Sequence, residues 1–571
     1  MRFLVAALLL VVPIPAATKA EQKAAQSILN SLTLRERVAQ LIFGVAYGDA
    51  PAANSKDGQR FRHWVKDLRI GGFIVVNRLQ YGLARNAEPH TMALFLNQMQ
   101  KLSKVPLLVG ADFERGASMR VSDTIKFPFN MAYAAARDSD ASRYEGLAAA
   151  REARALGVHW IFAPVSDVNN NPANPVINIR SFGENPEDVA MHVSSFIEGA
   201  HSDPKNPVLV SAKHFPGHGD TDVDSHLDLA HLSASRDRMD EVELVPFKAA
   251  IAHGVDSIMT AHMTVPAMEP EDIPATVSKR VLTGVLREEL GFKGLIVTDS
   301  MEMKGLTKQF KNGEAAVRAV EAGADVLLMP PDPDAVVRAL IAAVNSGRIP
   351  KKRIDQSVQR ILEAKVHVGI TKKKMVDLDA ITESLDLPEE GDRAQTIADR
   401  AVTLIRNEGD VVPLKTPEQA CVIASVGVRL STFGQRLADE FHRRQPNARV
   451  VFIDNGMNEA ALEAQVGDTS ACSAIVFATY TLNTKLSDNL SALVTKLTEG
   501  TVPVVLAAFG NPYLVADFPK VAAYMPAFST APPSEASVVK ALLGEIATTG
   551  KLPITIPDFA RYGDGIEIER K

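Results

Sequence analysis

Short apolar runs alternate with helix-like stretches along the first two thirds of the chain. Eight such runs occur, at residues 41–45, 72–76, 106–109, 158–163, 208–211, 255–260, 294–297 and 324–329. Between them, stretches such as 188–200 and 242–253 place apolar residues three and four positions apart, which is the period of an amphipathic helix. Strands that alternate with helices predict a parallel sheet, and near-continuous apolar runs are typical of strands buried on both faces.

Eight strand and helix units in about 330 residues match the number and size expected for a TIM barrel, so we predict an α/β fold of the (β/α)8 type. An open doubly wound sheet is the alternative. The barrel is favoured because polar residues gather at or just past the C-terminal ends of the predicted strands, the face where barrels build their active sites. These residues are Asn77, Asp112, Asp167, Lys213, His214, His262 and Asp299.

The chain has 571 residues, and single hydrophobic cores stop growing near about 300 residues, so we expect two domains. An amphipathic segment at 353–366 is predicted to close the barrel, which we place at residues 21–368. The polar residues 369–393 are predicted to form a linker. Residues 394–571 are predicted to form a smaller α/β sandwich, with strand-like runs at 420–426, 450–453, 474–479 and 504–508.

The N-terminal segment 1–20 has the features of a secretory signal peptide. A charged start at Arg2 is followed by the apolar run 3–12 and by small residues at Ala17 and Ala20. The run is too short to span a bilayer, and a buried N-terminal helix is the alternative. We therefore expect a periplasmic or secreted protein with no stable membrane insertion after signal removal.

Overall composition narrows the choice of partners. The net charge of −6 offers no general attraction to polyanions, so no nucleic-acid partner is expected. Cys421 and Cys472 are the two cysteines of the chain. An oxidising compartment permits a disulfide, but two buried thiols are an equal alternative, because sequence does not give the separation of the two residues.

The polar segment 213–226 reads Lys-His-Phe-Pro-Gly-His-Gly-Asp-Thr-Asp-Val-Asp-Ser-His and follows a predicted strand. Burying so many ionisable groups would cost more free energy than local packing returns, so we predict a loop at a strand end, where catalytic groups are common. Asp224 and His226 are two residues apart and project to the same side of an extended loop. Asp224 can then hydrogen-bond one imidazole nitrogen and leave the other free for proton transfer near neutral pH.

A metal site is an alternative use of this loop. His214 and His218 are four residues apart, as in helical zinc motifs, but Pro216 and Gly217 between them disfavour a helix. We therefore predict no metal and no cofactor. A solvated turn without function is a further alternative.

Other candidate groups surround the same predicted mouth. Asp299 ends the apolar run 294–298, where a carboxylate can be aimed at a reacting carbon, although a helix N-cap is an equal alternative. Segments 112–116 and 178–183 add carboxylate and guanidinium groups. With Lys213 and His214, these groups could bind several hydroxyls of a sugar ring, whereas surface salt bridges are the alternative.

Segment 213–221, together with Asp224-Ser225-His226, closely resembles the signature of family 3 glycoside hydrolases of the β-N-acetylglucosaminidase, NagZ-like branch. Residues 180–183 and 298–301 match further family blocks, and 550–565 resembles the end of the family's second domain. The resemblance implies that Asp299 is the nucleophile, His226 the general acid/base and Asp224 its dyad partner. The sugar-binding positions it implies are Asp112, Arg120, Arg180, Lys213 and His214.

The same resemblance implies a retaining exo-β-N-acetylglucosaminidase, which the signal-like segment 1–20 would make an exported enzyme. It would hydrolyse terminal β-linked N-acetylglucosamine from peptidoglycan or chitin fragments through a covalent glycosyl-aspartate, with a small carbohydrate as its partner. A phosphorylase and a β-glucosidase of the same superfamily are the enzymatic alternatives, and a non-catalytic sugar-binding protein is the other. Arg115 and Ser118 depart from the glycine and valine usual in the branch, which puts the contacts of the loop near Asp112 in question.

Overall fold

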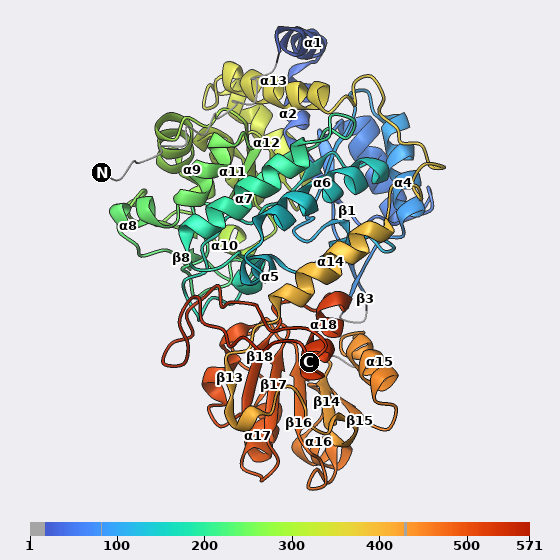
Figure 1. The fold of residues 1–571 in the computed structure, drawn as a ribbon. Helices are drawn as coiled ribbons and strands as arrows, with labels where there is room; N and C mark the ends of the chain where they lie inside the picture. The colour runs from blue at the N-terminus through green and yellow to red at the C-terminus, as the bar shows by residue number, and fades with distance from the viewer. Residues whose placement is uncertain (1–17, 81–82, 428–430) are drawn as a thin grey trace, which may run out of the picture.

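The computed structural model describes residues 18–80, 83–427 and 431–571 (Figure 1). The predicted signal peptide falls mostly on residues 1–17, outside the described residues. Helix α1 (Lys19–Asn30) covers the last two predicted signal positions, and Thr18 caps it. Export therefore stays a prediction.

Eight parallel strands form the sheet of the first domain, in the order β11-β9-β7-β6-β5-β2-β1-β12. A further parallel bridge between Val297 and Val326 joins the two outermost strands and closes the sheet into a barrel. This confirms the predicted TIM barrel and excludes the open sheet. The strands are β1 (Ile42–Ala46), β2 (Gly72–Val75), β5 (Leu108–Ala111), β6 (Trp160–Ile161), β7 (Leu209–Phe215), β9 (Ser257–Thr260), β11 (Leu295–Thr298) and β12 (Leu327–Leu328).

The barrel interior is filled by side chains. Trp160 contacts Phe43 and Phe162, with ring centroids 5.7 Å and 4.9 Å apart, and its Nε1 donates to Ser257 Oγ at 2.8 Å. Around the sheet lie α2 (Leu34–Gln40), α3 (Lys56–Arg62), η1 (His63–Leu68), α4 (Pro89–Leu102), α6 (Ser139–Leu156), α7 (Pro186–His201), α8 (Arg236–Glu241), α9 (Val245–Ala252), η5 (Arg280–Glu289), α10 (Lys304–Thr307), α11 (Asn312–Ala322), α12 (Pro333–Asn345) and α13 (Lys351–His367). Each of the eight predicted strand positions is occupied by a strand.

Two small strand pairs follow the barrel strands. The hairpin of β3 (Arg78–Gln80) and β4 (Leu83–Arg85) comes directly after β2. Strand β8 (Ala230–His231), which follows the histidine-rich loop, pairs with β10 (Met263–Thr264), which follows β9. This second pair joins the end of that loop to the neighbouring barrel strand.

The second domain is an α/β sandwich, as predicted. Its sheet has the order β13-β18-β17-β16-β14-β15, and only the pair of β13 with β18 is antiparallel among the described strands of this sheet. The strands are β13 (Arg406–Asn407), β14 (Cys421–Ser425), β15 (Arg449–Ile453), β16 (Ile475–Thr479), β17 (Val504–Ala508) and β18 (Ala523–Pro526). One face is covered by α15 (Gln435–Arg444) and α18 (Pro532–Leu542), the other by α16 (Glu459–Val466) and α17 (Asp488–Thr498).

Helix α14 (Pro388–Ala401) joins the two domains (Figure 1). It contacts α5 (Asn130–Ala135) and α6 of the barrel domain and α18 of the second domain. Glu390, in its first turn, is buried and accepts two hydrogen bonds from Arg151, at 2.5 Å and 2.6 Å. The predicted linker 369–393 therefore includes the start of a helix that is fixed on the barrel.

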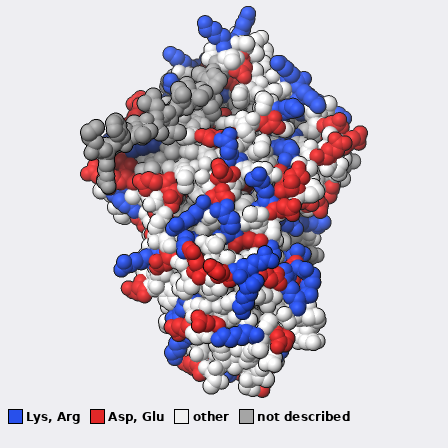
Figure 2. All heavy atoms as spheres, viewed as in Figure 1, with Lys and Arg blue, Asp and Glu red and all other residues white. Residues whose placement is uncertain are grey.

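A disulfide joins Cys421 to Cys472, with the two Cα atoms 5.7 Å apart. The sequence left this pairing open because it does not give the distance in space between two cysteines 51 positions apart. On the face shown in Figure 2, basic and acidic side chains are interspersed over both domains, so this face offers no extended basic area to a polyanion. None of the helices within the described ranges is both long and apolar enough to cross a membrane.

Candidate active site

A cavity of about 500 Å³ opens at the C-terminal ends of the barrel strands. Its charged and polar lining includes seven of the eight predicted site residues: Asp112, Arg120, Arg180, Lys213, His214, His226 and Asp299. The eighth, Asp224, contacts His226. The structure thus brings together in one place side chains that lie up to 187 residues apart in the sequence, from Asp112 to Asp299.

One side of the cavity carries alternating charges. Lys213 Nζ donates to Asp112 Oδ1 at 2.7 Å and lies 2.8 Å from Glu114 Oε1. Arg180 donates two hydrogen bonds to Glu114, at 2.9 Å and 2.7 Å, and Arg120 Nη2 donates to Asp112 Oδ2 at 2.6 Å. Each charge is held by partners of opposite sign, so the donors and acceptors are already oriented before a substrate binds.

The protonation states of this group follow from its contacts. Burial alone would raise the pKa of Asp112, but Lys213 and Arg120 lower it to about 2. Burial would also raise the pKa of Glu114, but Arg180 and Lys213 bring it well below the usual value. The pKa of Lys213 is raised, because Asp112 and Glu114 outweigh the effect of its burial. All three groups are therefore charged at neutral pH.

His214 is oriented by the fully buried Asp167. Asp167 Oδ2 lies 2.8 Å from His214 Nδ1, and Asp167 Oδ1 accepts from the backbone N–H groups of His214 and His218 at 3.1 Å and 2.7 Å. This arrangement assigns the proton on Nδ1 to the bond with Asp167 and leaves Nε2 free to contact a ligand.

Asp299 lies directly after β11 and lines the cavity. Its Oδ1 accepts from the backbone N–H of Ser300 at 2.6 Å. Burial would raise the pKa of Asp299, but His214, His262 and His226 around it lower the pKa below the ordinary value. The next helix, α10, begins at Lys304 with Met303 as its N-cap, so Asp299 is not a helix cap. The carboxylate is ionised and faces the cavity as a nucleophile requires.

Asp224 and His226 form the predicted pair. Asp224 Oδ1 lies 2.7 Å from His226 Nδ1 and also accepts from the backbone N–H of His226 at 2.8 Å. The predicted extended loop is wrong, because the backbone N–H groups of Leu227 and Asp228 donate to the Asp224 carbonyl and make a turn. The contact forms nonetheless, since a turn also lets an aspartate reach the residue two positions ahead. His226 borders the cavity, and within the described residues its Nε2 has no hydrogen-bond partner.

His218 holds the loop that carries this pair. Its two ring nitrogens lie 2.8 Å from Thr221 Oγ1 and 2.8 Å from Ser225 Oγ, and burial lowers its pKa to about 4. Asn174 donates to the carbonyls of His218 and Gly219 at 2.8 Å and 3.0 Å. The ring nitrogens of His218 are thus engaged by hydroxyls. Over the part of the chain that the structure describes, no group of three or more potential metal ligands has suitable geometry.

The sequence assigns no individual role to three residues of this site: Asp167 and His262 are predicted only as polar residues at strand ends, and Glu114 only within segment 112–116. Glu114 is the buried partner of two predicted sugar-binding residues, and Asp167 orients His214. His262, fully buried, lies 2.9 Å from the Ser300 carbonyl through Nε2 and 2.8 Å from Thr276 Oγ1 through Nδ1. All three stand at or near strand ends, which is why the sequence placed them at the predicted mouth, but their partners could not be read from the sequence.

The cavity also has an apolar lining. Arg115 and Ser118, which depart from the family pattern near Asp112, lie outside the cavity. The apolar contributors are Ile74, Val76, Met119, Met259, Met303, Leu328 and Met329. Arg115 does not line the cavity, and its guanidinium lies over the ring of Phe129, 4.9 Å from the centroid. Ser118 donates to the Arg115 carbonyl at 3.3 Å. The cavity therefore offers charged groups for hydroxyls and flexible apolar side chains for a less polar substituent.

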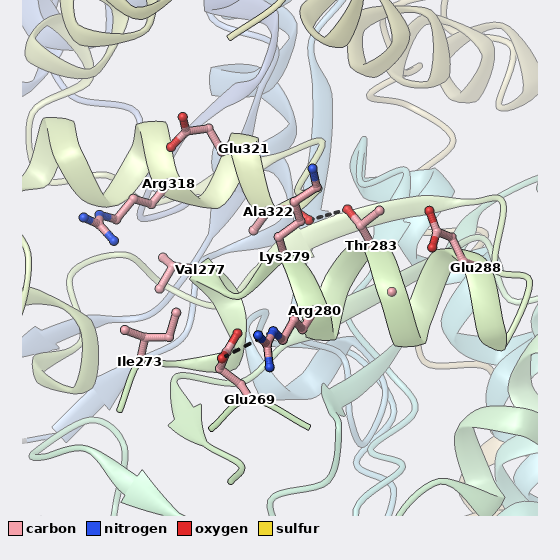
Figure 3. Close-up of a pocket in the computed structure, with 11 residues that line it drawn as sticks. Glu269, Ile273, Val277, Lys279, Arg280, Thr283, Glu288, Arg318, Glu321 and Ala322 are labelled. Carbon is pink, nitrogen blue, oxygen red and sulfur yellow. Dashed lines mark hydrogen bonds and ion pairs between the residues drawn. The ribbon is translucent and has the colours of Figure 1, made fainter. Parts of the chain in front are cut away.

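A separate hollow of about 550 Å³ lies between η5 and α11, away from the strand ends (Figure 3). Arg280 faces Glu269 across it, at 4.0 Å, and the Thr283 hydroxyl donates to the Ala322 carbonyl at 2.7 Å. It contains none of the predicted site residues.

Comparison with known proteins places this geometry in a family. Residues 33–364 match the model of the glycosyl hydrolase family 3 N-terminal domain. A β-N-acetylglucosaminidase/β-glucosidase of Cellulomonas fimi is 27% identical over 91% of this chain and 93% of its own length. A β-hexosaminidase A of Pseudoalteromonas piscicida is 32% identical over 65% of each chain.

The structure of a family 3 β-N-acetylglucosaminidase from Paenibacillus sp. str. FPU-7 is also similar. It has a TM-score of 0.79 and 33% identity, and the match covers 92% of this chain and 99% of that one. The family model matches the barrel domain, and the likeness to this structure extends over both domains. The chain belongs to glycosyl hydrolase family 3 and is a glycoside hydrolase.

Proposed function

We propose that the protein is a retaining exo-β-N-acetylglucosaminidase that uses Asp299 as nucleophile and His226 as acid/base. The observation that carries the proposal is that the ionised Asp299 and the free nitrogen of His226 border one cavity with a set of fixed charged groups. An ionised carboxylate and a proton donor beside one sugar-sized cavity are what a double-displacement glycosidase requires.

In the first step, a carboxylate oxygen of Asp299 attacks the anomeric carbon of the bound sugar. The bond between this carbon and the leaving oxygen breaks, and His226 Nε2 gives its proton to that oxygen. Asp224, at 2.7 Å from Nδ1, stabilises the imidazolium before the transfer and keeps Nε2 directed away from itself. The product of this step is a glycosyl-aspartate.

In the second step, neutral His226 takes a proton from a water molecule, and the oxygen of this water attacks the anomeric carbon. The bond to Asp299 breaks and returns the carboxylate, so the released sugar keeps its β configuration. Asp112, Glu114, Lys213 and Arg180 supply the acceptors and donors for the sugar hydroxyls.

N-acetylglucosamine is the proposed sugar. The named activities of the Cellulomonas fimi, Pseudoalteromonas piscicida and Paenibacillus relatives support this choice. The methionines in the cavity lining offer an apolar contact for the acetamido methyl group. Fragments of peptidoglycan or chitin carry such terminal sugars.

A direct test compares the mature protein on chromogenic β-N-acetylglucosaminide and β-glucoside side by side. The proposal predicts a clear preference for the first. A higher kcat/KM for the glucoside would mean that the enzyme is a β-glucosidase. No turnover of either substrate would favour a sugar-binding protein. Activity should survive a chelator, whereas a loss that zinc restores would indicate a metal-dependent hydrolase.

Phosphorolysis is the second candidate, because the acid/base is a histidine, which presents no negative charge to an incoming phosphate. The same reaction run with and without phosphate separates the two functions by product. Free N-acetylglucosamine in phosphate buffer supports hydrolysis, and a sugar 1-phosphate supports phosphorolysis.

Export from the cytoplasm is part of the proposal. The signal-like segment 1–20 supports it, and so does the disulfide of Cys421 and Cys472, since disulfides persist in oxidising compartments. Fractionation of cells that express the full chain tests it. Uncleaved protein found only in the cytoplasm would refute export without affecting the catalytic assignment.

A further inference from the structure

The loop between β6 and α7 carries Arg180 and lies against the second domain. Glu184 donates its backbone N–H to the Pro553 carbonyl at 3.0 Å, and its carboxylate accepts two hydrogen bonds from Thr555, at 2.6 Å each. A Cβ atom added to Gly183 would come within 2.4 Å of the same Pro553 carbonyl. The contact is therefore close enough to require glycine at position 183.

A single side chain joins this interface to the sugar-binding group. Asn169 Nδ2 donates to Tyr513 Oη of the second domain at 3.2 Å, and Asn169 Oδ1 accepts from the backbone N–H of Asn178 at 3.0 Å. Asn178 begins the short helix η3 (Asn178–Arg180), which ends at Arg180. The Arg180 guanidinium then reaches Glu114 with two hydrogen bonds.

The two ends of the Asn169 amide are not interchangeable. The N–H of Asn178 requires an acceptor, so Oδ1 must face it and Nδ2 must face Tyr513. Asn169 is fully buried and Tyr513 is 7% exposed, so bulk water does not replace a missing partner at this point. Without the hydroxyl, Nδ2 becomes a buried donor with no acceptor, and the amide orientation that supports Asn178 is no longer favoured.

The backbone of η3 is sensitive to such a change. Asn178 has φ +43°, in the left-handed region that only a few non-glycine residues adopt. The hydrogen bond from its N–H to Asn169 helps to keep this conformation. A shift of η3 moves the backbone of Arg180, and with it the guanidinium that borders the cavity.

We propose that Tyr513 of the second domain is a positioning residue for the sugar-binding site, acting through Asn169 and η3 on Arg180. This rests on the proposed function, because it takes Arg180 to bind the sugar. The second domain thereby affects substrate affinity without contributing a group to the reaction.

The test is Tyr513→Phe in the full-length protein, with Tyr562→Phe as the matched control. Tyr562 is also in the second domain, and its hydroxyl also bonds to the barrel domain. It donates to Asp188 at the start of α7, whereas the Tyr513 hydroxyl accepts from Asn169. Tyr513→Phe should raise KM for the N-acetylglucosaminide by about fivefold, as one buried hydrogen bond is typically worth. In this variant kcat should stay within about twofold, and Tyr562→Phe should change neither parameter.

An unchanged KM in Tyr513→Phe, or an equal rise in both variants, would overturn the proposal. Asn169→Ala tests the same link from the barrel side, and serves also if Tyr513→Phe does not fold. It should raise KM at least as much, and Tyr513→Phe should add nothing in its background; a further independent rise would mean that Tyr513 acts elsewhere. Calorimetric binding of N-acetylglucosamine to the same variants should weaken in parallel, which keeps this test separate from a failure of the wild type to turn over substrate.

Discussion

Replacing Asp224 by asparagine tests how the acid/base is held. In the wild type, the backbone N–H of His226 donates to Asp224 Oδ1 at 2.8 Å. The side-chain oxygen of asparagine can accept the same hydrogen bond, so the turn should persist. What is lost is the negative charge opposite Nδ1, at 2.7 Å. A charge-assisted hydrogen bond contributes about 1.5 to 3 kcal/mol. Because the His226 side chain is 57% exposed, we expect about 1 to 2 kcal/mol here, or roughly 5- to 30-fold in rate.

The loss should depend on the leaving group. For a disaccharide, whose leaving oxygen needs a proton, kcat/KM should fall by this factor, whereas for a nitrophenyl glycoside it should change little. In Asp224→Asn, hydrolysis of the glycosyl-aspartate can become the slow step for the nitrophenyl substrate. Azide attacks the anomeric carbon without needing a base, so it should restore turnover in that case. Asp222→Asn, an exposed position in the same loop, is the control and should leave both substrates unaffected. An equal loss on both substrates, or no loss, would refute the role given to Asp224.

Three further outcomes are expected. Burial lowers the pKa of Lys365 to about 7. Below pH 7 the folded protein must bury the charged ammonium, which costs stability, and this cost disappears as the pH rises towards the pKa of lysine in the unfolded chain. Lys365→Met should therefore raise the melting temperature most at or below pH 7, with the difference shrinking towards pH 10; a difference independent of pH would count against a buried neutral lysine. Replacing Cys421 and Cys472 together by serine should destabilise the protein by about 3 kcal/mol, measured by thermal unfolding, and an unchanged melting temperature would show that the disulfide adds nothing. Asp454→Asn and Asp488→Asn in the second domain should change the rate on an aryl glycoside by less than about tenfold, and a larger loss at unchanged stability would move the acid/base to that domain.

The barrel could be predicted because its strands are buried on both faces and read as continuous apolar runs. In the second domain the same signal located β14 to β17 but missed β13, which has two residues, and β18, which ends in proline. The two residues of β13, Arg406 and Asn407, are polar and form no apolar run, and a proline argues against a strand in the interior of a sheet. The disulfide was beyond prediction for another reason: the distance between Cys421 and Cys472 depends on how β14 and β16 pair, and that register is a tertiary property.

In the candidate site too, some features could be predicted from the sequence and others could not. Residues at strand ends could be named from the sequence, because the barrel topology brings all such ends to one mouth. Their partners could not: Arg180 and Glu114 are 66 residues apart, and His214 and Asp167 are 47 apart. The contact of Tyr513 with Asn169 spans 344 residues and two domains. No local pattern in the sequence indicates it.

The central claim is that Asp299 forms a covalent bond with the sugar. The most direct measurement is mass spectrometry of the protein after reaction with a 5-fluoro-β-N-acetylglucosaminyl fluoride, a substrate that forms the glycosyl-enzyme faster than it is hydrolysed. The account predicts one added glycosyl mass, located by peptide mapping on Asp299 and absent from Asp299→Asn. A label on another carboxylate, or turnover of the natural sugar with inversion and no adduct, would contradict it.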